Sequence, residues 1–317
     1  LPSNKSVAIK KDLNYILISD GKENYIIAEN LLEKFTERVG LSFKIISNCS
    51  GDRLIGIEAQ HPFLLNKINI IDGEHVTDDS GTGCVHIAPA HGVEDFELGA
   101  KHNLEVINPI QSNGVFSGLP EEFNGIHVYK LDDHVIDLLE KKDRLLSKNK
   151  FKHSYPHCWR TKTPLIYRAT PQWFISMNKN NLLEKTLNKL SDVNWLPAWG
   201  EARIQGMLED RPDWCISRQR KWGVPITMLI NKKTGEPHSN SSIIFSRVSK
   251  LVEKHGIEKW FDIKIEDLID NPKDYEKVTD TLDVWFDSGS SHAAVLEKIS
   301  DLSFPADLYL EGSDQHR

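Results

Sequence analysis

Short runs of apolar and β-branched residues, separated by turn-forming residues, dominate the first 150 residues of the chain. Runs at residues 7–9, 15–18, 24–27, 42–46 and 84–87 have the length and composition of β-strands. Asp20-Gly21 lies between two of these runs and predicts a hairpin. Apolar residues recur at helical spacing over 31–39 and 132–146. The pattern predicts a mixed sheet accompanied by a few helices.

The character of the chain changes near residue 150, which we interpret as a domain boundary. A polar turn at residues 231–236 then opens a less distinctive region, residues 239–277, with a helical pattern over 243–255. We interpret this region as an insertion. Six of the eight tryptophans follow the boundary, with many arginines among them: Trp159, Trp173, Trp195, Trp199, Trp214 and Trp222.

Two later segments, residues 281–292 and 308–316, each place small polar residues after a short apolar run. This pattern predicts strands that present polar groups at their carboxyl ends, as open α/β sheets do. The alternative is a pair of ordinary helix starts capped by Ser288 and Ser313. Residues 306–317 have the pattern of a buried strand entering a helix, and residue 1 is leucine, so we expect an internal segment of a longer protein.

Composition limits the class of protein. A chain of 317 residues predicts two domains, or one domain with a large insertion. The net charge of −7 excludes a global basic field, so an RNA partner would need local patches of Lys and Arg. Four widely separated cysteines indicate a reduced, cytoplasmic compartment. No apolar run approaches the roughly 18 residues that span a bilayer, so we expect no membrane association.

The segment from Ser80 to Phe96 has the composition of a small-molecule pocket. Gly81 and Gly83 allow the backbone to approach a ligand closely, while His86, Glu94 and Asp95 supply polar groups. The alternative is a glycine-rich turn followed by a helix over residues 93–102.

The tryptophans and arginines after residue 150 are compatible with two roles. They could form a nucleic-acid surface, because guanidinium groups bind phosphates and indole rings stack on bases. Packing in a core or a domain interface is the favoured interpretation, since tryptophan is buried on average. In residues 213–223, where Arg218, Arg220 and Lys221 lie beside Trp222, RNA contact and a solvated face are equally compatible.

Six motifs, in this order, resemble those of the isoleucyl-tRNA synthetases, a family of class I aminoacyl-tRNA synthetases. The resemblance covers essentially the whole chain; valyl-tRNA synthetase ranks second, and a non-synthetic RNA-binding or trans-editing protein is the alternative from another class. The motifs are Gly81-Thr-Gly-Cys-Val-His-Ile-Ala-Pro-Ala-His-Gly, Ser154-Tyr-Pro-His-Cys-Trp-Arg, Arg168-Ala-Thr-Pro-Gln-Trp-Phe, Asp213-Trp-Cys-Ile-Ser-Arg-Gln-Arg, Asp283-Val-Trp-Phe-Asp-Ser-Gly and Glu311-Gly-Ser-Asp-Gln-His-Arg.

The resemblance implies a domain plan of the α/β class. Residues 1–150 would be an N-terminally truncated editing domain, mixed α/β and barrel-like. Residues 151–225 would return the chain to the catalytic domain, and 226–280 would form a connective insertion. Residues 281–317 would belong to the second half of a Rossmann-like catalytic domain. The family's ATP-binding signatures are not in this chain, so ATP and Mg²⁺ are expected for the full-length enzyme, as a monomer, and this segment alone should not aminoacylate.

The resemblance also implies an editing site that hydrolyses valyl-tRNA(Ile). Asp95 would hold the α-ammonium group of the valyl ester, and His86 would contact the terminal ribose or exclude isoleucine. Asn4 would order the attacking water or the ribose. We expect Asp95 to position substrate rather than act as a base, because an ion-paired carboxylate is a poor proton acceptor. Gly81, Thr82 and Gly83 would line the pocket, which is expected to be incomplete without the family's upstream threonine-rich strand.

For the synthetic half, the resemblance implies contacts of Glu311, Asp314 and Gln315 with the aminoacyl-adenylate. The partners would be tRNA(Ile), isoleucine and ATP. We expect no zinc in this segment, because Thr161 replaces the second cysteine of the Cys-x-x-Cys knuckle that begins at Cys158 in some members. The residues expected to contact tRNA are Arg203, Arg218, Arg220, Lys221 and Trp222.

Overall fold

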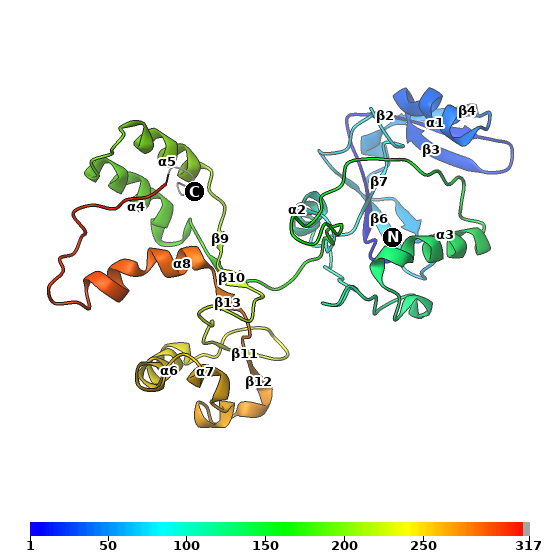
Figure 1. The fold of residues 1–317 in the computed structure, drawn as a ribbon. Coiled ribbons are helices and arrows are strands. Elements are labelled where there is room, and N and C mark those ends of the chain that lie inside the picture. Colours follow the sequence, from blue (N-terminus) through cyan, green and yellow to red (C-terminus); the bar gives the residue numbers. More distant parts are fainter. Residues whose placement is uncertain (313–317) are drawn as a thin grey trace. The chain divides into compact units, whose positions relative to one another are not determined.

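The computed structural model describes residues 1–312 and contains two compact units (Figure 1). The first runs from Leu1 to Thr170 and the second begins at Pro171. Among the described residues, no helix has both the length and the apolar composition needed to cross a bilayer.

The first unit contains a four-stranded sheet in the order β5-β6-β1-β7. Its strands are β1 (Ser6–Ile9), β5 (Glu58–Gln60), β6 (Lys67–Asp72) and β7 (Val85–Ile87). Strand β1 is parallel to β6 and antiparallel to β7. The strands β1 and β7 were predicted from their apolar runs, whereas β5 and β6 were not.

A second sheet of the first unit has the order β3-β2-β4, with β2 at Asn14–Ser19, β3 at Asn24–Ala28 and β4 at Lys44–Ser50. The predicted hairpin is confirmed: Gly21 has a φ of 88°, and Asp20 Oδ1 accepts hydrogen bonds from the backbone N–H groups of Lys22 and Glu23, both at 2.8 Å. Both sheets are antiparallel or mixed, and the described strands form two open sheets rather than a closed barrel.

Three helices complete the first unit: α1 (Leu32–Val39), α2 (Val93–Lys101) and α3 (Leu131–Lys141). Helix α3 ends before the predicted residue 146. Asp143 has a φ of 52°, and the N–H of Arg144 donates to the carbonyl of Leu139, which closes the helix end. Buried apolar residues pack around α3 into one core cluster: Phe63, Ile110, Phe116, Phe123, Leu131 and Leu138.

The second unit contains three two-stranded antiparallel sheets. Their strands are β8 (Phe174–Ile175) with β9 (Trp214–Cys215), β10 (Ser217–Arg218) with β13 (Thr281–Leu282), and β11 (Leu229–Asn231) with β12 (Tyr275–Lys277). Its helices are α4 (Leu182–Lys189), α5 (Trp199–Glu209), α6 (Ser241–His255), α7 (Lys259–Asp262) and α8 (Val284–Gly289).

Helix α6 confirms the helical pattern predicted over residues 243–255. Together with α7 and β11 it surrounds a core of its own, in which Trp260 is 1% exposed. The buried members of this core are Leu229, Ile244, Val248, Trp260, Ile263 and Leu268.

Two predictions for the C-terminal segments were wrong. The short strand predicted at 281 is present as β13, but residues 284–289 form α8 instead of a polar turn, because the Asp283 carboxylate accepts from the N–H of Trp285 and caps the helix. Residues 306–310 are exposed and form no strand, since no described strand offers them a hydrogen-bonding partner.

The favoured interpretation placed the tryptophans in a core or a domain interface, and the core part is not confirmed, because none of the six is fully buried within its own unit. Trp159, Trp199 and Trp222 are 75%, 55% and 93% exposed. Trp214 is half-buried because its indole N–H is used in a polar network, described below.

Candidate functional site

Strand β7 and helix α2 position the polar residues of the predicted editing motif. Val7 of β1 lies opposite His86 of β7, and the N–H of Lys5 donates to the carbonyl of Ile87 at 2.8 Å. The chain then turns through residues 88–92 into α2, whose first turn contains Asp95. The register of β1 against β7 therefore brings residues 1–4 close to the start of α2.

Asp95 is held by the backbone. Its Oδ2 accepts a hydrogen bond of 2.8 Å from the N–H of Ala88, and its side chain is only half-buried. A carboxylate in the first turn of a helix is stabilised by the helix dipole. The carboxylate is thus fixed in place while part of it stays accessible to a cationic group.

His86 lies close enough to Asp95 for their charges to interact. Burial by the surrounding chain lowers the pKa of His86, and the nearby Asp95 carboxylate raises it to a smaller extent. The imidazole nevertheless keeps substantial solvent contact. A lowered pKa favours the neutral imidazole at neutral pH.

His91 joins this group, although the sequence analysis assigned it no role. Its Nδ1 lies 3.0 Å from the carbonyl of Tyr167 and its Nε2 lies 3.0 Å from Ser3 Oγ. Because a carbonyl only accepts, Nδ1 must carry the proton and a neutral Nε2 must accept from the Ser3 hydroxyl. Burial lowers the pKa of His91, which keeps the ring in this neutral form. The signal available was its place five residues after His86 in the same motif.

A cavity of about 840 Å³ lies beside His91 in the same unit. Ser3, Ala88 and His91 form one wall, and residues of α3 and of the segment 155–167 form the others, most of them apolar. His86 and Asp95 do not line this cavity. The volume lies within the range of pockets that bind small molecules.

Asn4 is 3% exposed and lies at the start of β1. Its Nδ2 donates to the carbonyl of Ser6 at 3.0 Å, whereas its Oδ1 has no hydrogen-bond partner. A buried amide oxygen without a partner is costly and is usually satisfied by water or a ligand. An unpaired amide oxygen could accept a hydrogen bond from water, and the water-ordering role of Asn4 remains a prediction.

The loop Gly81-Thr82-Gly83 lies at the other end of β7 from Ala88 and Asp95. It is bound to the second sheet: the carbonyl of Thr82 accepts from the N–H of Ala28 at 2.9 Å, and that of Gly83 accepts from Tyr15 Oη at 2.7 Å. The structure therefore brings His86, Asp95 and residues 1–4 together and separates the glycine loop from them. The pocket-lining role of the loop stays a prediction.

Replacing Gly83 by alanine should destabilise the first unit by about 2–4 kcal/mol. Its φ is +73°, and an added Cβ would lie 2.5 Å from the Cβ of Ala28, so backbone strain and overpacking add together. Gly81→Ala is the matched control, with a φ of +71° but no atom within 4 Å of the new Cβ, and should cost only about 1 kcal/mol. Urea unfolding measures the loss of stability in both variants. Equal losses in Gly83→Ala and Gly81→Ala would contradict the argument that the new Cβ of the former is overpacked against Ala28.

Histidines whose pKa is lowered in the folded chain should make the first unit less stable in acid. Burial lowers the pKa of His61, His86 and His91 below 6.5, so the unfolded chain binds more protons than the folded chain in this range. Stability should therefore fall as the pH drops from about 6.5 toward the folded pKa values. Urea midpoints between pH 7.5 and 5 would show it. His91→Gln should reduce the dependence of the urea midpoint on pH, whereas His134→Gln, at an exposed position on α3, should leave that dependence unchanged.

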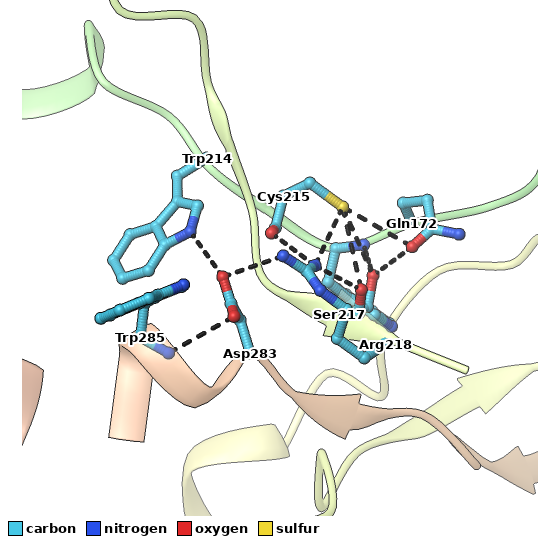
Figure 2. A network of polar contacts seen from close by, with 8 residues as sticks. Gln172, Trp214, Cys215, Ser217, Arg218, Asp283 and Trp285 are labelled. Carbon is cyan, nitrogen blue, oxygen red and sulfur yellow. Dashed lines mark hydrogen bonds and ion pairs between the residues drawn. The ribbon is translucent and has the colours of Figure 1, made fainter. Parts of the chain in front are cut away.

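In the second unit, Asp283 is the centre of a polar network (Figure 2). The carboxylate is 4% exposed and accepts from Trp214 Nε1 at 3.1 Å and from Arg218 at 2.9 Å. Arg218 also donates to the backbone carbonyls of Cys215 and Ser217. The network ties β9 and β10 to the start of α8.

The five residues predicted to contact tRNA differ in how accessible their side chains are. The guanidinium of Arg218 is engaged with Asp283, whereas the other four side chains are exposed. Their RNA contacts stay predictions. The exposed members are Arg203, Arg220, Lys221 and Trp222.

Only one of the residues predicted for the adenylate is described. Glu311 is exposed, and Tyr309 Oη lies 3.5 Å from its Oε1. Asp314 and Gln315 lie outside the described residues. Within residues 1–312, no three His, Cys, Asp or Glu side chains are grouped as a metal site would require.

Comparisons with a protein family and with individual relatives agree with each other. Residues 8–317 match the family described as tRNA synthetases class I (I, L, M and V). The isoleucine–tRNA ligase of Francisella philomiragia subsp. philomiragia is 52% identical over 318 aligned residues, and that of Teredinibacter turnerae is 49% identical over 319. Both alignments cover 100% of this chain and 34% of the relative, so the chain spans about a third of the length of these curated relatives.

Among solved structures, one described as the crystal structure of GlLeuRS-CP1 is 16% identical and covers 46% of this chain and 78% of its own. Its TM-score is 0.38, which is too low to bear on the fold.

Proposed function

Since the chain belongs to the family of class I tRNA synthetases, we propose that it is the part of an isoleucine–tRNA ligase that holds the hydrolytic editing site and a portion of the synthetic site. Identities near 50% to ligases named for isoleucine, over the whole chain, support isoleucine over valine as the cognate amino acid. The same identities argue against a separate trans-editing protein.

The fixed, half-exposed carboxylate of Asp95 carries the proposal for editing. Its bond to the N–H of Ala88 holds it without neutralising it. A misacylated valyl ester bears an α-ammonium group, for which a positioned carboxylate is the natural partner. In this role Asp95 orients the substrate, and the attacking group is a water molecule.

The neighbouring side chains supply the remaining roles. His86, whose pKa is lowered by burial, would contact the terminal ribose as a neutral imidazole. Asn4 would use its unpaired Oδ1 to accept a hydrogen bond from the attacking water. That bond would orient the water toward the carbonyl carbon of the ester. Breaking the C–O bond between that carbon and the ribose oxygen then releases valine and a free ribose hydroxyl.

Editing is needed because binding alone discriminates too weakly between valine and isoleucine. One methylene in an apolar pocket is worth only about 1–3 kcal/mol, a limit for which isoleucine–tRNA ligases are themselves the standard example. Valine therefore enters the synthetic site too often, and a second site is needed to hydrolyse valyl-tRNA(Ile).

For the whole enzyme we propose tRNA(Ile), isoleucine and ATP with Mg²⁺ as partners, a monomeric state and a cytoplasmic location. ATP and Mg²⁺ would supply the activation of isoleucine as an adenylate. Of the residues predicted for the adenylate, only Glu311 is described, and it is exposed, with Tyr309 Oη 3.5 Å from its Oε1. We therefore assign no step of activation to this segment.

The test is the deacylation of valyl-tRNA(Ile) against isoleucyl-tRNA(Ile) by the full-length protein that contains this chain. Selective release of valine is the expected result. Equal hydrolysis of both esters, or hydrolysis of neither by the folded protein, would overturn the assignment. Replacing tRNA(Ile) by tRNA(Val) charged with threonine tests the valyl alternative in the same assay.

A further inference from the structure

A basic stretch without acidic residues stands out in the first unit. Although the chain has 39 Lys and Arg against 46 Asp and Glu, residues 144–170 contain no Asp or Glu. Lys148 lies 3.9 Å from Glu140, and none of the ion pairs among the described residues involves Lys150 or Lys152. The basic residues of the stretch are Arg144, Lys148, Lys150, Lys152, Arg160, Lys162 and Arg168.

Ring side chains occupy every second position from Phe151 to His157 along exposed chain, and Lys150 and Lys152 flank the first of them. The ring of His153 lies 5.1 Å from that of Phe151 and 5.9 Å from that of Tyr155, and the rings of Tyr155 and His157 lie 6.3 Å apart. In an extended chain, alternate residues point to the same side, so the rings form one row and Lys150 and Lys152 point away from it. All of residues 146–157 are exposed.

The row of rings leads into a narrow turn. The N–H of Leu165 donates to the carbonyl of Pro156, and that of Cys158 donates to the carbonyl of Thr163 at 2.9 Å. The tip of this turn presents Trp159, which is 75% exposed, with the guanidinium of Arg160 4.9 Å from the centre of its ring. Phe151, at the other end of the row, is 79% exposed.

We propose that residues 148–162, the basic-aromatic segment, bind a single-stranded stretch of RNA. Flat exposed rings stack on bases, and neighbouring lysines and arginines bind the phosphates of the same strand. The inference rests on the proposed function, which requires the single-stranded end of an aminoacylated tRNA to be held by this protein. It assigns that contact to a segment that contains none of the five residues predicted from the sequence to contact tRNA.

Unpaired bases distinguish single-stranded RNA from other polyanions, such as an RNA duplex or an acidic protein. Paired bases in a duplex do not offer their faces to side chains, so a duplex would engage the lysines but not the rings. An acidic protein would likewise use only the charges. The exposed faces of Phe151 and Trp159 therefore favour unpaired nucleotides.

The test measures the affinity of the full-length protein for a labelled single-stranded RNA oligonucleotide and for a blunt RNA duplex of equal length, across a range of salt concentrations. Lys150→Gln with Lys152→Gln should reduce the slope of log K against log salt by about 1.4, since each phosphate contact on a single strand contributes about 0.7. Phe151→Ala with Trp159→Ala should weaken single-strand binding roughly tenfold or more and leave that slope unchanged.

The matched control is Lys22→Gln with Lys233→Gln, which removes two exposed charges elsewhere and should change neither quantity. All six positions are exposed, so circular dichroism should report unchanged folding. Equal weakening of duplex and single-strand binding by the aromatic substitutions, or no effect of either double substitution, would overturn the proposal.

The same proteins separate this inference from the proposed function. If the wild type releases valine selectively and the four substitutions leave RNA binding unchanged, only the basic-aromatic segment is misassigned. If they weaken single-strand binding as expected while the wild type fails to release valine, only the editing function is contradicted.

Discussion

Replacing Asp95 by asparagine should lower kcat/KM for deacylation of valyl-tRNA(Ile) by about tenfold to a hundredfold. A hydrogen bond to a charged group is worth about 1.5–3 kcal/mol, and the amide keeps an oxygen that accepts from the N–H of Ala88 while losing the charge that binds the α-ammonium. Asp95→Ala should lose at least as much, because Ala88 then also lacks its acceptor. The measurement is the release of valine from preformed valyl-tRNA(Ile).

Glu94 provides the matched control. It lies next to Asp95 in the first turn of α2 and is exposed, so Glu94→Gln removes an equal charge from the same helix end. Deacylation should be unchanged in this variant, and aminoacylation with isoleucine should be unchanged in all three. If Asp95→Asn kept both affinity and hydrolysis, the positioning role of Asp95 would be wrong.

Replacing Asp283 by alanine should destabilise the second unit by about 3 kcal/mol. The substitution removes the acceptor for Trp214 and Arg218 and the cap of α8 at once. Loss of one partner from a buried ion pair costs about 3–5 kcal/mol, and the partial exposure of Arg218 places this pair at the lower end. Denaturant unfolding followed by tryptophan fluorescence and circular dichroism measures the loss.

Two further substitutions separate the contributions. Asp283→Asn keeps an oxygen for the N–H of Trp285 and should lose less than alanine. Burial and the charge of Asp283 raise the pKa of Asp287, so its charged form is disfavoured in the folded state. Asp287→Asn, in the same helix, should therefore leave stability unchanged or raise it at neutral pH. A comparable loss in this variant would contradict the network's role.

Local patterns predicted much of the first unit. The strands β1, β2, β3, β4 and β7 follow from runs of apolar and β-branched residues, and the hairpin follows from Asp20-Gly21. Helices α1 and α3 of this unit and α6 of the second unit follow from their periodicity, whereas α2 was offered only as the alternative to a pocket. Strands β5 and β6 were missed, because neither stands out without its neighbours: β6 alternates polar and apolar residues over only six positions, and β5 has three residues.

The C-terminal segments show where local patterns fail. A run such as Asp283-Val-Trp-Phe-Asp-Ser-Gly has high strand propensity, yet one capping carboxylate is enough to make it helical. Residues 306–310 have the composition of a strand, but a strand requires a hydrogen-bonding neighbour that propensity does not report.

The sequence predicted individual residues of the candidate site but not which of them lie together in the structure. His86 and Asp95 stand out by residue type, and the register of β1 and β7 explains why they meet residues 1–4. The Gly81–Gly83 loop was assigned to the same pocket because it is close in sequence, whereas the length of β7 separates it from Asp95. The link between His91 and Tyr167 depends on tertiary structure and has no local signal.

The parallel pairing of β1 with β6 has a consequence for how the chain folds during synthesis. The two strands are separated by residues 10–66, and that interval contains the whole β3-β2-β4 sheet. The hairpin of β2 and β3 joins neighbouring residues and can form as soon as it leaves the ribosome, whereas β1 must wait for distant partners. Strand β1 is therefore made before β2 and β3 but completes its pairing after them, and its apolar residues stay exposed in the meantime.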